Sequence, residues 1–374
     1  MRRVQQYLIA CSFLVLLTSC ISPNSIPLSE RGLDKASLAT IIDQQVEKLF
    51  ASDGFSGSVL IAKGSRPIYT KATGYADRSQ NRLNTLNTPF NLGPMSKMFT
   101  AVAVMQLIER GDLSLLDTVG KYLPDYPNRR INRTVTIRQL PSHRSGMGDY
   151  IDSPSYRRIK DFLQSQQDFL DIITDNALYF RPNERYRYTN SGAVVLGRIV
   201  EIVTGLSYYD YVRSNIFQPA DMMSSDYFTK DETSSDKAIG YLDEFGTTNE
   251  FTLGYIGSAA WGSYASANDL LKYTNALKMN TLMQRGALQQ LLEPILDLGP
   301  DCEYAFLHTI CKLNAHSYYA ERPSYMAFDG PVRGASYFWF KDRDIVIIVL
   351  SNGGNQQESD LVNKILQWVA YSDV

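Results

Sequence analysis

The stretch from Phe99 to Leu107 most constrains what this chain can fold into. It is rich in Ala, Val and Met, so a helix formed there is apolar on most of its faces and must be buried. The chain has 374 residues, of which 44% are hydrophobic, which suffices for one large domain or two small ones around this helix. No sequence repeat and no long low-complexity linker divides it.

Strand patterns lie early and late in the chain, and helical patterns lie between them and at both ends. Residues 120–235 hold several helical patterns among Pro-rich and Tyr-rich loops. The expected strands are residues 57–63, 67–72, 335–340 and 344–350, and the expected terminal helices are Leu33–Phe50 and residues 361–369. This order predicts an α+β fold, in which an antiparallel sheet is flanked by terminal helices and carries an inserted helical subdomain.

Seven short segments, taken together and in their order along the chain, indicate the type of fold. They are Phe55–Lys63, Gly74–Asp77, Lys97–Asp117, Thr136–Met147, Tyr186–Gly192, Tyr255–Leu271 and Phe328–Asn352. Together they resemble the serine β-lactamase and penicillin-binding protein family, which includes class C β-lactamases, D-Ala-D-Ala carboxypeptidases and esterases. Tyr188-Thr189-Asn190, for example, resembles the family's Tyr-x-Asn motif. The resemblance implies the serine β-lactamase/DD-peptidase-like fold, with its active site in the groove between the sheet and the helical half.

Position 94 departs from the family at the residue that carries the reaction. Gly93-Pro94-Met95-Ser96-Lys97 stands where the family has its Ser-x-x-Lys signature, in which the Lys helps to deprotonate an attacking Ser. Here Lys97 is present and Pro94 replaces the Ser. Proline has neither a hydroxyl nor an amide hydrogen, so it can neither form an acyl-enzyme nor stabilise an oxyanion. Because proline is favoured in the first turn of a helix, the fold should tolerate it.

A second catalytic motif is also altered. Phe328-Asp329-Gly330 occupies the place of the family's Lys-Thr-Gly or His-x-Gly, so only Gly330 remains. Phe328 cannot bind a substrate carboxylate as the family's cation or imidazole does. Ser96 lies two residues from position 94, roughly 200° around a helix, so we expect it to point into the packing and not to act as a nucleophile.

Lys97 and Tyr188 are the surviving members of the proton-transfer machinery that the resemblance implies. In active relatives the matching Lys and Tyr share protons with the Ser, so here they are interpreted as a vestigial general-base pair. The alternative is a buried hydrogen-bonded pair kept for packing. Asn190 would bind a substrate amide, as in the family, and His143 is predicted to serve a turn. Three aromatic residues are either walls of the groove or core side chains: Trp261, Tyr264 and Phe328.

The first twenty residues are predicted to be a targeting segment. Arg2 and Arg3 precede the apolar run Tyr7–Leu17, which is too short to span a membrane comfortably. The run ends in Leu17-Thr18-Ser19-Cys20, which resembles a bacterial lipobox, in which the Cys becomes the lipidated first residue of the mature chain. The alternative is an ordinary secretory signal with a chance Cys.

These features divide the chain into a signal peptide (residues 1–20), a polar tether (21–32) and one β-lactamase-like domain (33–374). Ile21 is not the Asp that signals inner-membrane retention in some bacteria. The sequence therefore predicts a protein of the bacterial cell envelope that faces the periplasm, is anchored to a membrane by its lipid, and favours the outer membrane.

Export would place the other cysteines in an oxidising compartment. Cys302 and Cys311 are predicted to form a disulfide, since both lie in one polar insertion that we expect to be exposed; the alternative is two free thiols. The three histidines show no zinc-ligand spacing, so no metal or other cofactor is predicted: His143, His308 and His316. The formal net charge of −2 predicts no nucleic-acid-binding surface.

Three functions remain open at this point. The first is a lipid-anchored, catalytically silent member of the family that binds a peptide, a peptidoglycan fragment or a protein in the groove. The second is an active carboxypeptidase, esterase or β-lactamase that uses another nucleophile, or a water activated near Lys97 and Tyr188. The third is a mutated form of an active parent, because one base change converts a Ser codon into a Pro codon. Phe328 argues against the third.

Overall fold

An antiparallel sheet forms the framework of the molecule. The computed structural model describes residues 32–53, 55–173, 178–232, 236–241, 254–313, 316–321, 334–353 and 357–374. The strands of the main sheet are β1 (Gly57–Lys63), β2 (Arg66–Thr73), β7 (Leu296–Gly299), β8 (Cys302–Tyr304), β9 (Thr309–Leu313), β10 (His316–Glu321), β11 (Ala335–Phe340) and β12 (Ile345–Ser351). Within the described residues they form one eight-stranded sheet in the order β2-β1-β12-β11-β10-β9-β8-β7.

Both faces of the central strands are covered, which explains why those strands are apolar at most positions. On β12, Ile345, Ile347 and Val349 pack into the core shared with the terminal helices. The alternate residues Val346, Ile348 and Leu350 pack into the core on the other face. Successive side chains of a strand point to opposite faces, so a strand buried on both sides reads as a continuous apolar run.

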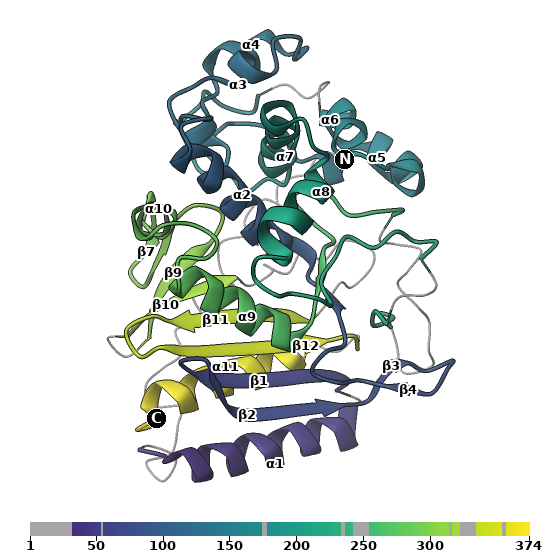
Figure 1. Cartoon of the computed structure of the whole chain (residues 1–374), viewed down its shortest axis with the longest axis vertical. Helices are drawn as coiled ribbons and strands as arrows, with labels where there is room; N and C mark the ends of the chain where they lie inside the picture. Colours follow the sequence, from purple (N-terminus) through teal and green to yellow (C-terminus); the bar gives the residue numbers. More distant parts are fainter. Residues whose placement is uncertain are drawn as a thin grey trace, which may run out of the picture.

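The terminal helices α1 (Lys35–Asp53) and α11 (Gln357–Tyr371) lie together on one face of the sheet (Figure 1). On the other side, α9 (Ala267–Lys278) lies over the sheet, and α10 (Arg285–Leu291) lies beside β7. The other helices form the inserted half in the upper part of Figure 1: α2 (Lys97–Glu109), α3 (Val119–Tyr122), α4 (Arg129–Thr134), α5 (Pro154–Ile159), α6 (Gln166–Ile173), α7 (Ser191–Thr204) and α8 (Tyr208–Val212). The predicted α+β architecture is confirmed.

The helix α2 is buried along most of its length, as its composition predicts. Every residue from Lys97 to Met105 is buried, and the helix packs against α7, α8 and α10. A short 3₁₀ turn, Gly93–Ser96, leads directly into it. The chain reaches that turn through a small two-stranded sheet of β5 (Phe90–Asn91) and β6 (Tyr264–Ala265). A second small sheet joins β3 (Tyr75–Asp77) to β4 (Arg82–Leu83).

The expectation of an exposed polar insertion around Cys302 and Cys311 is wrong. These residues lie opposite each other on β8 and β9, inside the main sheet. The connection between the two strands is buried and packs against the core: Ala305, Phe306, Leu307 and His308. The strands are too short for their alternation to stand out in the sequence, and only pairing with β10 reveals them as part of the sheet.

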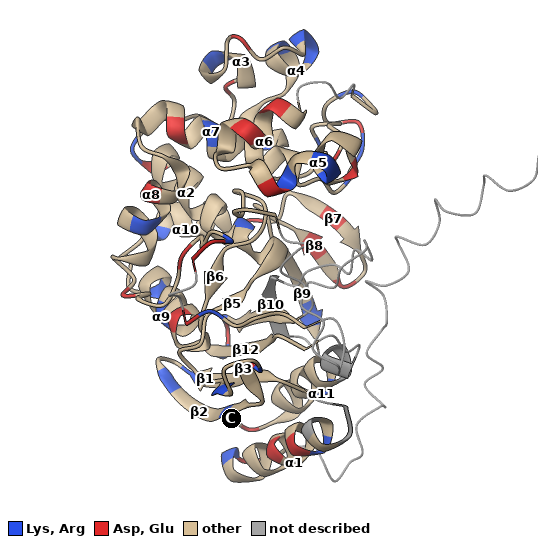
Figure 2. Ribbon diagram, turned by 90° about the vertical axis from the view of Figure 1, so that its right-hand side faces the viewer, with Lys and Arg blue, Asp and Glu red and all other residues tan. Residues whose placement is uncertain are grey.

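The surface carries both charges over both halves of the molecule. In the view of Figure 2, Lys and Arg segments are interspersed with Asp and Glu segments. No single described helix is both long and apolar enough to cross a membrane, and only the bent pair of Ser191–Thr204 with Tyr208–Phe217 meets the criteria of length and composition.

Candidate functional site: the Lys97 cluster

The turn before α2 explains why a proline is accepted at position 94. Pro94 occupies the first turn of the 3₁₀ segment and is buried. The turn is held by its neighbours: the Gly93 amide donates to Asn91 Oδ1 at 2.9 Å, and the Gly262 amide donates to the Gly93 carbonyl at 3.3 Å. An amide in the first turn of a helix has no partner within that helix, so its loss costs little.

Lys97 is the centre of a buried hydrogen-bonded cluster. Its side chain is 2% exposed. Its ammonium group has three acceptors: Tyr188 Oη at 2.8 Å, Asn190 Oδ1 at 2.7 Å and the Ala260 carbonyl at 3.1 Å. A lysine ammonium has three hydrogens, so each of these oxygens can accept one of them. The structure thus brings together Lys97, Tyr188 and Asn190 at the start of α2, directly after the turn that contains Pro94.

Asp149 orients the amide of Asn190, a role that the motifs did not reveal. Its carboxylate accepts hydrogen bonds from the backbone amide of Asn190 at 2.9 Å and from Asn190 Nδ2 at 2.8 Å. Because Nδ2 faces Asp149, Oδ1 faces Lys97. Burial raises the pKa of Asp149, against the hydrogen bonds from Asn190 and Ile151 and the positive charge of Lys97. Only its place two residues after Met147, at the end of the Thr136–Met147 motif, could have drawn attention to it.

Asn190 is fully buried, with 0% of its side chain exposed. In this structure its amide is engaged on both sides, by Lys97 and by Asp149. That it also binds a substrate amide stays a prediction, and such a contact would require the surrounding residues to open.

His143 supports Tyr188 from behind. The Thr189 amide donates to His143 Nδ1 at 3.3 Å, so the hydrogen of the neutral ring lies on Nε2, which donates to Tyr304 Oη at 2.7 Å. The imidazole also packs against the Tyr188 ring, with 4.6 Å between the ring centroids. Burial and then the charge on Lys97 lower the pKa of His143 to about 3. The predicted turn role is confirmed, because His143 has a φ of 55°, and its ring also contacts three tyrosines, Tyr186, Tyr188 and Tyr304.

Ser96 is held in the packing, as the helix geometry predicts. Its hydroxyl donates to the Gly93 carbonyl at 2.7 Å and accepts hydrogen bonds from the amide and the hydroxyl of Ser263, at 2.9 and 2.8 Å. The side chain is fully buried. A hydroxyl engaged in this way has no open path to a ligand.

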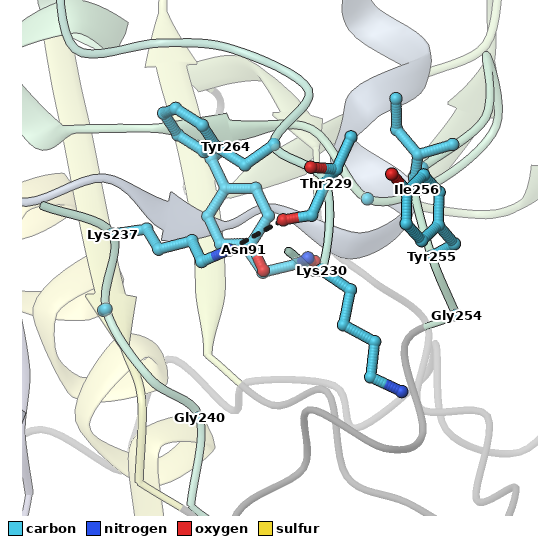
Figure 3. Close-up of a pocket in the computed structure, with 13 residues that line it drawn as sticks. Asn91, Thr229, Lys230, Lys237, Gly240, Gly254, Tyr255, Ile256 and Tyr264 are labelled. Carbon is cyan, nitrogen blue, oxygen red and sulfur yellow. Dashed lines mark hydrogen bonds between the residues drawn. The ribbon is translucent and has the colours of Figure 1, made fainter. Parts of the chain in front are cut away.

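An open pocket lies among Asn91, Lys237, Tyr255 and Tyr264 (Figure 3). Asn91, Gly262 and Tyr264 belong to its wall. Lys237 points into it and donates to the Thr229 carbonyl at 3.0 Å. The pocket includes none of the residues that accept from Lys97. Of the two described aromatic candidates, Tyr264 is buried in this wall against Phe228, and Trp261 is half-buried.

The remaining predicted residues fall into two groups. Cys302 and Cys311 are joined by a disulfide. Cys20, Phe328 and Gly330 lie outside the described residues. In the part of the chain that the structure describes, no group of three or more His, Cys, Asp or Glu side chains is placed to hold a metal ion.

Comparisons with known proteins identify the family. A family model described as Beta-lactamase matches residues 40–372. A penicillin-binding protein of Bacillus subtilis (strain 168) is 31% identical over 279 residues, which are 70% of this chain and 60% of that protein. Protein flp of Staphylococcus aureus (strain N315) is 29% identical over 205 residues, 53% of this chain and 41% of that protein. The chain therefore matches less than two thirds of the length of either relative.

Solved structures agree with this result. The penicillin-binding protein from Bacillus halodurans superposes with a TM-score of 0.76 and 30% sequence identity, covering 86% of this chain and 98% of that one. The fold is therefore the one that the sequence motifs predict, and the Lys97 cluster lies at the start of α2, where the motifs place Lys97. This chain belongs to the beta-lactamase family of serine hydrolase-like proteins.

Proposed function

We propose that this protein is a lipid-anchored member of the beta-lactamase family that forms no acyl-enzyme and binds peptides or cell-wall fragments beside the Lys97 cluster. One observation carries the proposal: the residue one helical turn before Lys97 is Pro94, which has no hydroxyl. The relatives named above include penicillin-binding proteins, which supports a ligand from the same chemical class.

The groups around position 94 support the loss of acyl-transfer chemistry. The three oxygens around Lys97 Nζ come from Tyr188, Asn190 and Ala260, so these contacts do not supply the serine that acyl transfer needs. Ser96, the serine nearest in sequence, is engaged by Gly93 and Ser263. Its hydroxyl is therefore not free to attack a carbonyl.

Covalent labelling tests this proposal. We expect the purified protein to acquire no label from a fluorescent penicillin or from a fluorophosphonate, as judged by gel fluorescence and intact mass. An adduct in a one-to-one ratio with the protein would contradict the proposal and would show that another nucleophile acts.

Binding is measured separately. A peptide that ends in D-Ala-D-Ala, or a soluble peptidoglycan fragment, is titrated while the melting temperature is followed. A ligand that binds only the folded state raises the melting temperature saturably. No shift with any of these ligands would exclude the peptide-binding part of the proposal.

The intact geometry of the Lys97 cluster favours one second candidate, a protein that has lost its nucleophile by mutation of an active parent. Pro94→Ser returns a hydroxyl and an amide hydrogen to the turn. We expect this variant to recover little turnover, because Phe328 still stands where the family has a cation or imidazole. Strong recovered esterase or β-lactamase activity would support the mutated parent instead.

A further inference from the structure

The segment from 178 to 187, which leads into Tyr188, is fastened to the turn at 143–146. Three backbone amides in it donate to carbonyls of the turn, in the pairs Tyr179–Gly146, Asn183–Arg144 and Arg187–His143, at 2.8, 2.7 and 3.0 Å. Gly146 has a φ of 79°, and a Cβ there would collide with the carbonyl oxygen of Phe180. The close approach therefore requires glycine. It brings the two ends of the segment, Tyr179 and Arg187, next to each other.

The Arg187 guanidinium stacks on the Tyr179 ring. Its central carbon lies 3.7 Å from the ring centroid. Tyr179 is 61% exposed and Arg187 is half-buried, so the pair is open to solvent. Among the described residues, Arg187 has no ion pair and its side chain has no hydrogen-bond partner. The ring holds one face of the guanidinium in place, and the N–H groups on its edge remain available.

The segment that holds this pair, together with the turn it is fastened to, carries more basic than acidic residues. Arg144 donates to the Asn183 carbonyl at 2.7 Å, and Arg181 lies in the same segment. The only acidic residue between 178 and 188 is Glu184, which is 3.4 Å from Arg185. Arg185 is 72% exposed and its charge is partly balanced by that contact. Within the part of the chain that the structure describes, Arg187 thus has arginines as neighbours in sequence and no carboxylate paired with it.

We propose that Arg187, stacked on Tyr179, is a carboxylate-binding site and that it takes the C-terminal carboxylate of a peptide; this rests on the peptide-binding function proposed above. A guanidinium edge and a carboxylate form two parallel hydrogen bonds in one plane, which a stacked arginine presents in advance. Arg187 directly precedes Tyr188, whose Cα is therefore about 3.8 Å away. A peptide held at Arg187 would lie beside the Lys97 cluster.

Calorimetric titration of the full-length protein tests this site. The ligands are a peptide ending in D-Ala-D-Ala with a free carboxylate, the same peptide as a C-terminal amide, and inorganic phosphate. The variants are Arg187→Gln, Arg187→Lys and Tyr179→Ala, with Arg185→Gln as the matched control in the same segment. Melting temperatures of all variants confirm that they fold.

For the wild type we expect the free acid to bind and to bind more tightly than the amide. Arg187→Gln should weaken binding of the free acid roughly tenfold, because a charge-assisted bidentate pair is lost. Arg187→Lys and Tyr179→Ala should each recover only part of the affinity, since a lysine has no planar fork and an unstacked arginine is not held in place. Arg185→Gln should change affinity less than twofold, and the amide should be insensitive to every variant.

Three other results would contradict the Arg187 site, each in a different way. Equal binding of the acid and the amide, unchanged by Arg187→Gln, would overturn the Arg187 site and leave the proposed peptide binding in place. Binding of neither peptide would overturn both. Binding of phosphate with higher affinity than the free acid, lost in Arg187→Gln, would replace the carboxylate with a phosphate ligand and so contradict the assignment.

Discussion

Lys97 Nζ keeps three oxygen acceptors within hydrogen-bonding distance although the side chain at position 94 offers none. A buried ammonium that lost these oxygens would be very costly, so the residues around it contribute to the stability of the fold. Asp149 and Asn190 supply part of the compensation, because the carboxylate orients the amide oxygen towards the cation. Lys97 is thus a buried side chain held in place by the polar groups of Tyr188, Asn190 and Ala260.

The lowered pKa of His143 predicts how the stability of the protein changes in acid. Its pKa is about 6.5 in the unfolded chain and about 3 in the folded one, because the folded state buries it near Lys97. Above pH 6.5 both states hold it neutral. Below that, the unfolded chain binds a proton that the folded chain does not, so the free energy of unfolding falls as the pH falls towards 3.

The slope from one such histidine approaches about 1.4 kcal/mol per pH unit. Urea denaturation of the wild type and of His143→Gln between pH 7 and 4 measures it. The variant should show the shallower slope. Burial lowers the pKa of His308 to about 4, so His308 also lowers the free energy of unfolding in acid, and it does so in both proteins. Burial raises the pKa of Asp149, so Asp149 has the opposite effect. Parallel slopes would show that His143 is not held neutral in the fold.

At the scale of elements, the pair β8 and β9 links the edge of the sheet to the Lys97 cluster. Tyr304 is the last residue of β8, and its hydroxyl is hydrogen-bonded to His143. In the buried connection after it, the Leu307 amide donates to the Pro141 carbonyl at 3.1 Å. The Cys302–Cys311 disulfide closes this hairpin. Part of the wall behind Tyr188 therefore depends on two short strands.

Removing the disulfide should destabilise the protein without unfolding it. A bridge that closes a loop this short reduces the entropy of the unfolded chain by an amount worth about 2–3 kcal/mol. Urea denaturation of Cys302→Ala/Cys311→Ala against the oxidised wild type measures the difference. The wild type under reducing conditions is the control and should fall to the same value. Equal stabilities of the oxidised wild type and the double variant would contradict the estimate.

At the scale of the whole molecule, the described part is a sheet with helices on both faces, and the charges of both signs are spread over both halves. The proposed attachment to a membrane therefore rests on the N-terminal sequence and on Cys20, not on the described domain. Covalent lipid anchors hold a protein at a membrane through their buried methylene groups.

Detergent phase separation tests the anchor. Expressed in a bacterium with lipoprotein processing, the full-length protein should enter the detergent phase, and Cys20→Ser should stay in the aqueous phase. Metabolic labelling with a fatty acid is the control, since only a lipidated Cys20 incorporates it. Equal partition of the two proteins would favour an ordinary secretory signal.

The sequence by itself determined the framework: α1, β1, β2, β11, β12 and α11 follow from local periodicity, and Pro94 and Lys97 follow from spacing along one helix. Only the tertiary structure decided which distant residues meet. Asp149 reaches Asn190 across 41 residues, and His143 reaches Tyr304 across 161. Periodicity records which face of an element is buried, but not which side chain of another element it will contact. Those contacts arise only when the chain folds and its elements pack together. The contacts of Asp149, of Tyr304 and of the Arg187–Tyr179 pair could therefore not be predicted from the residues next to them in the sequence.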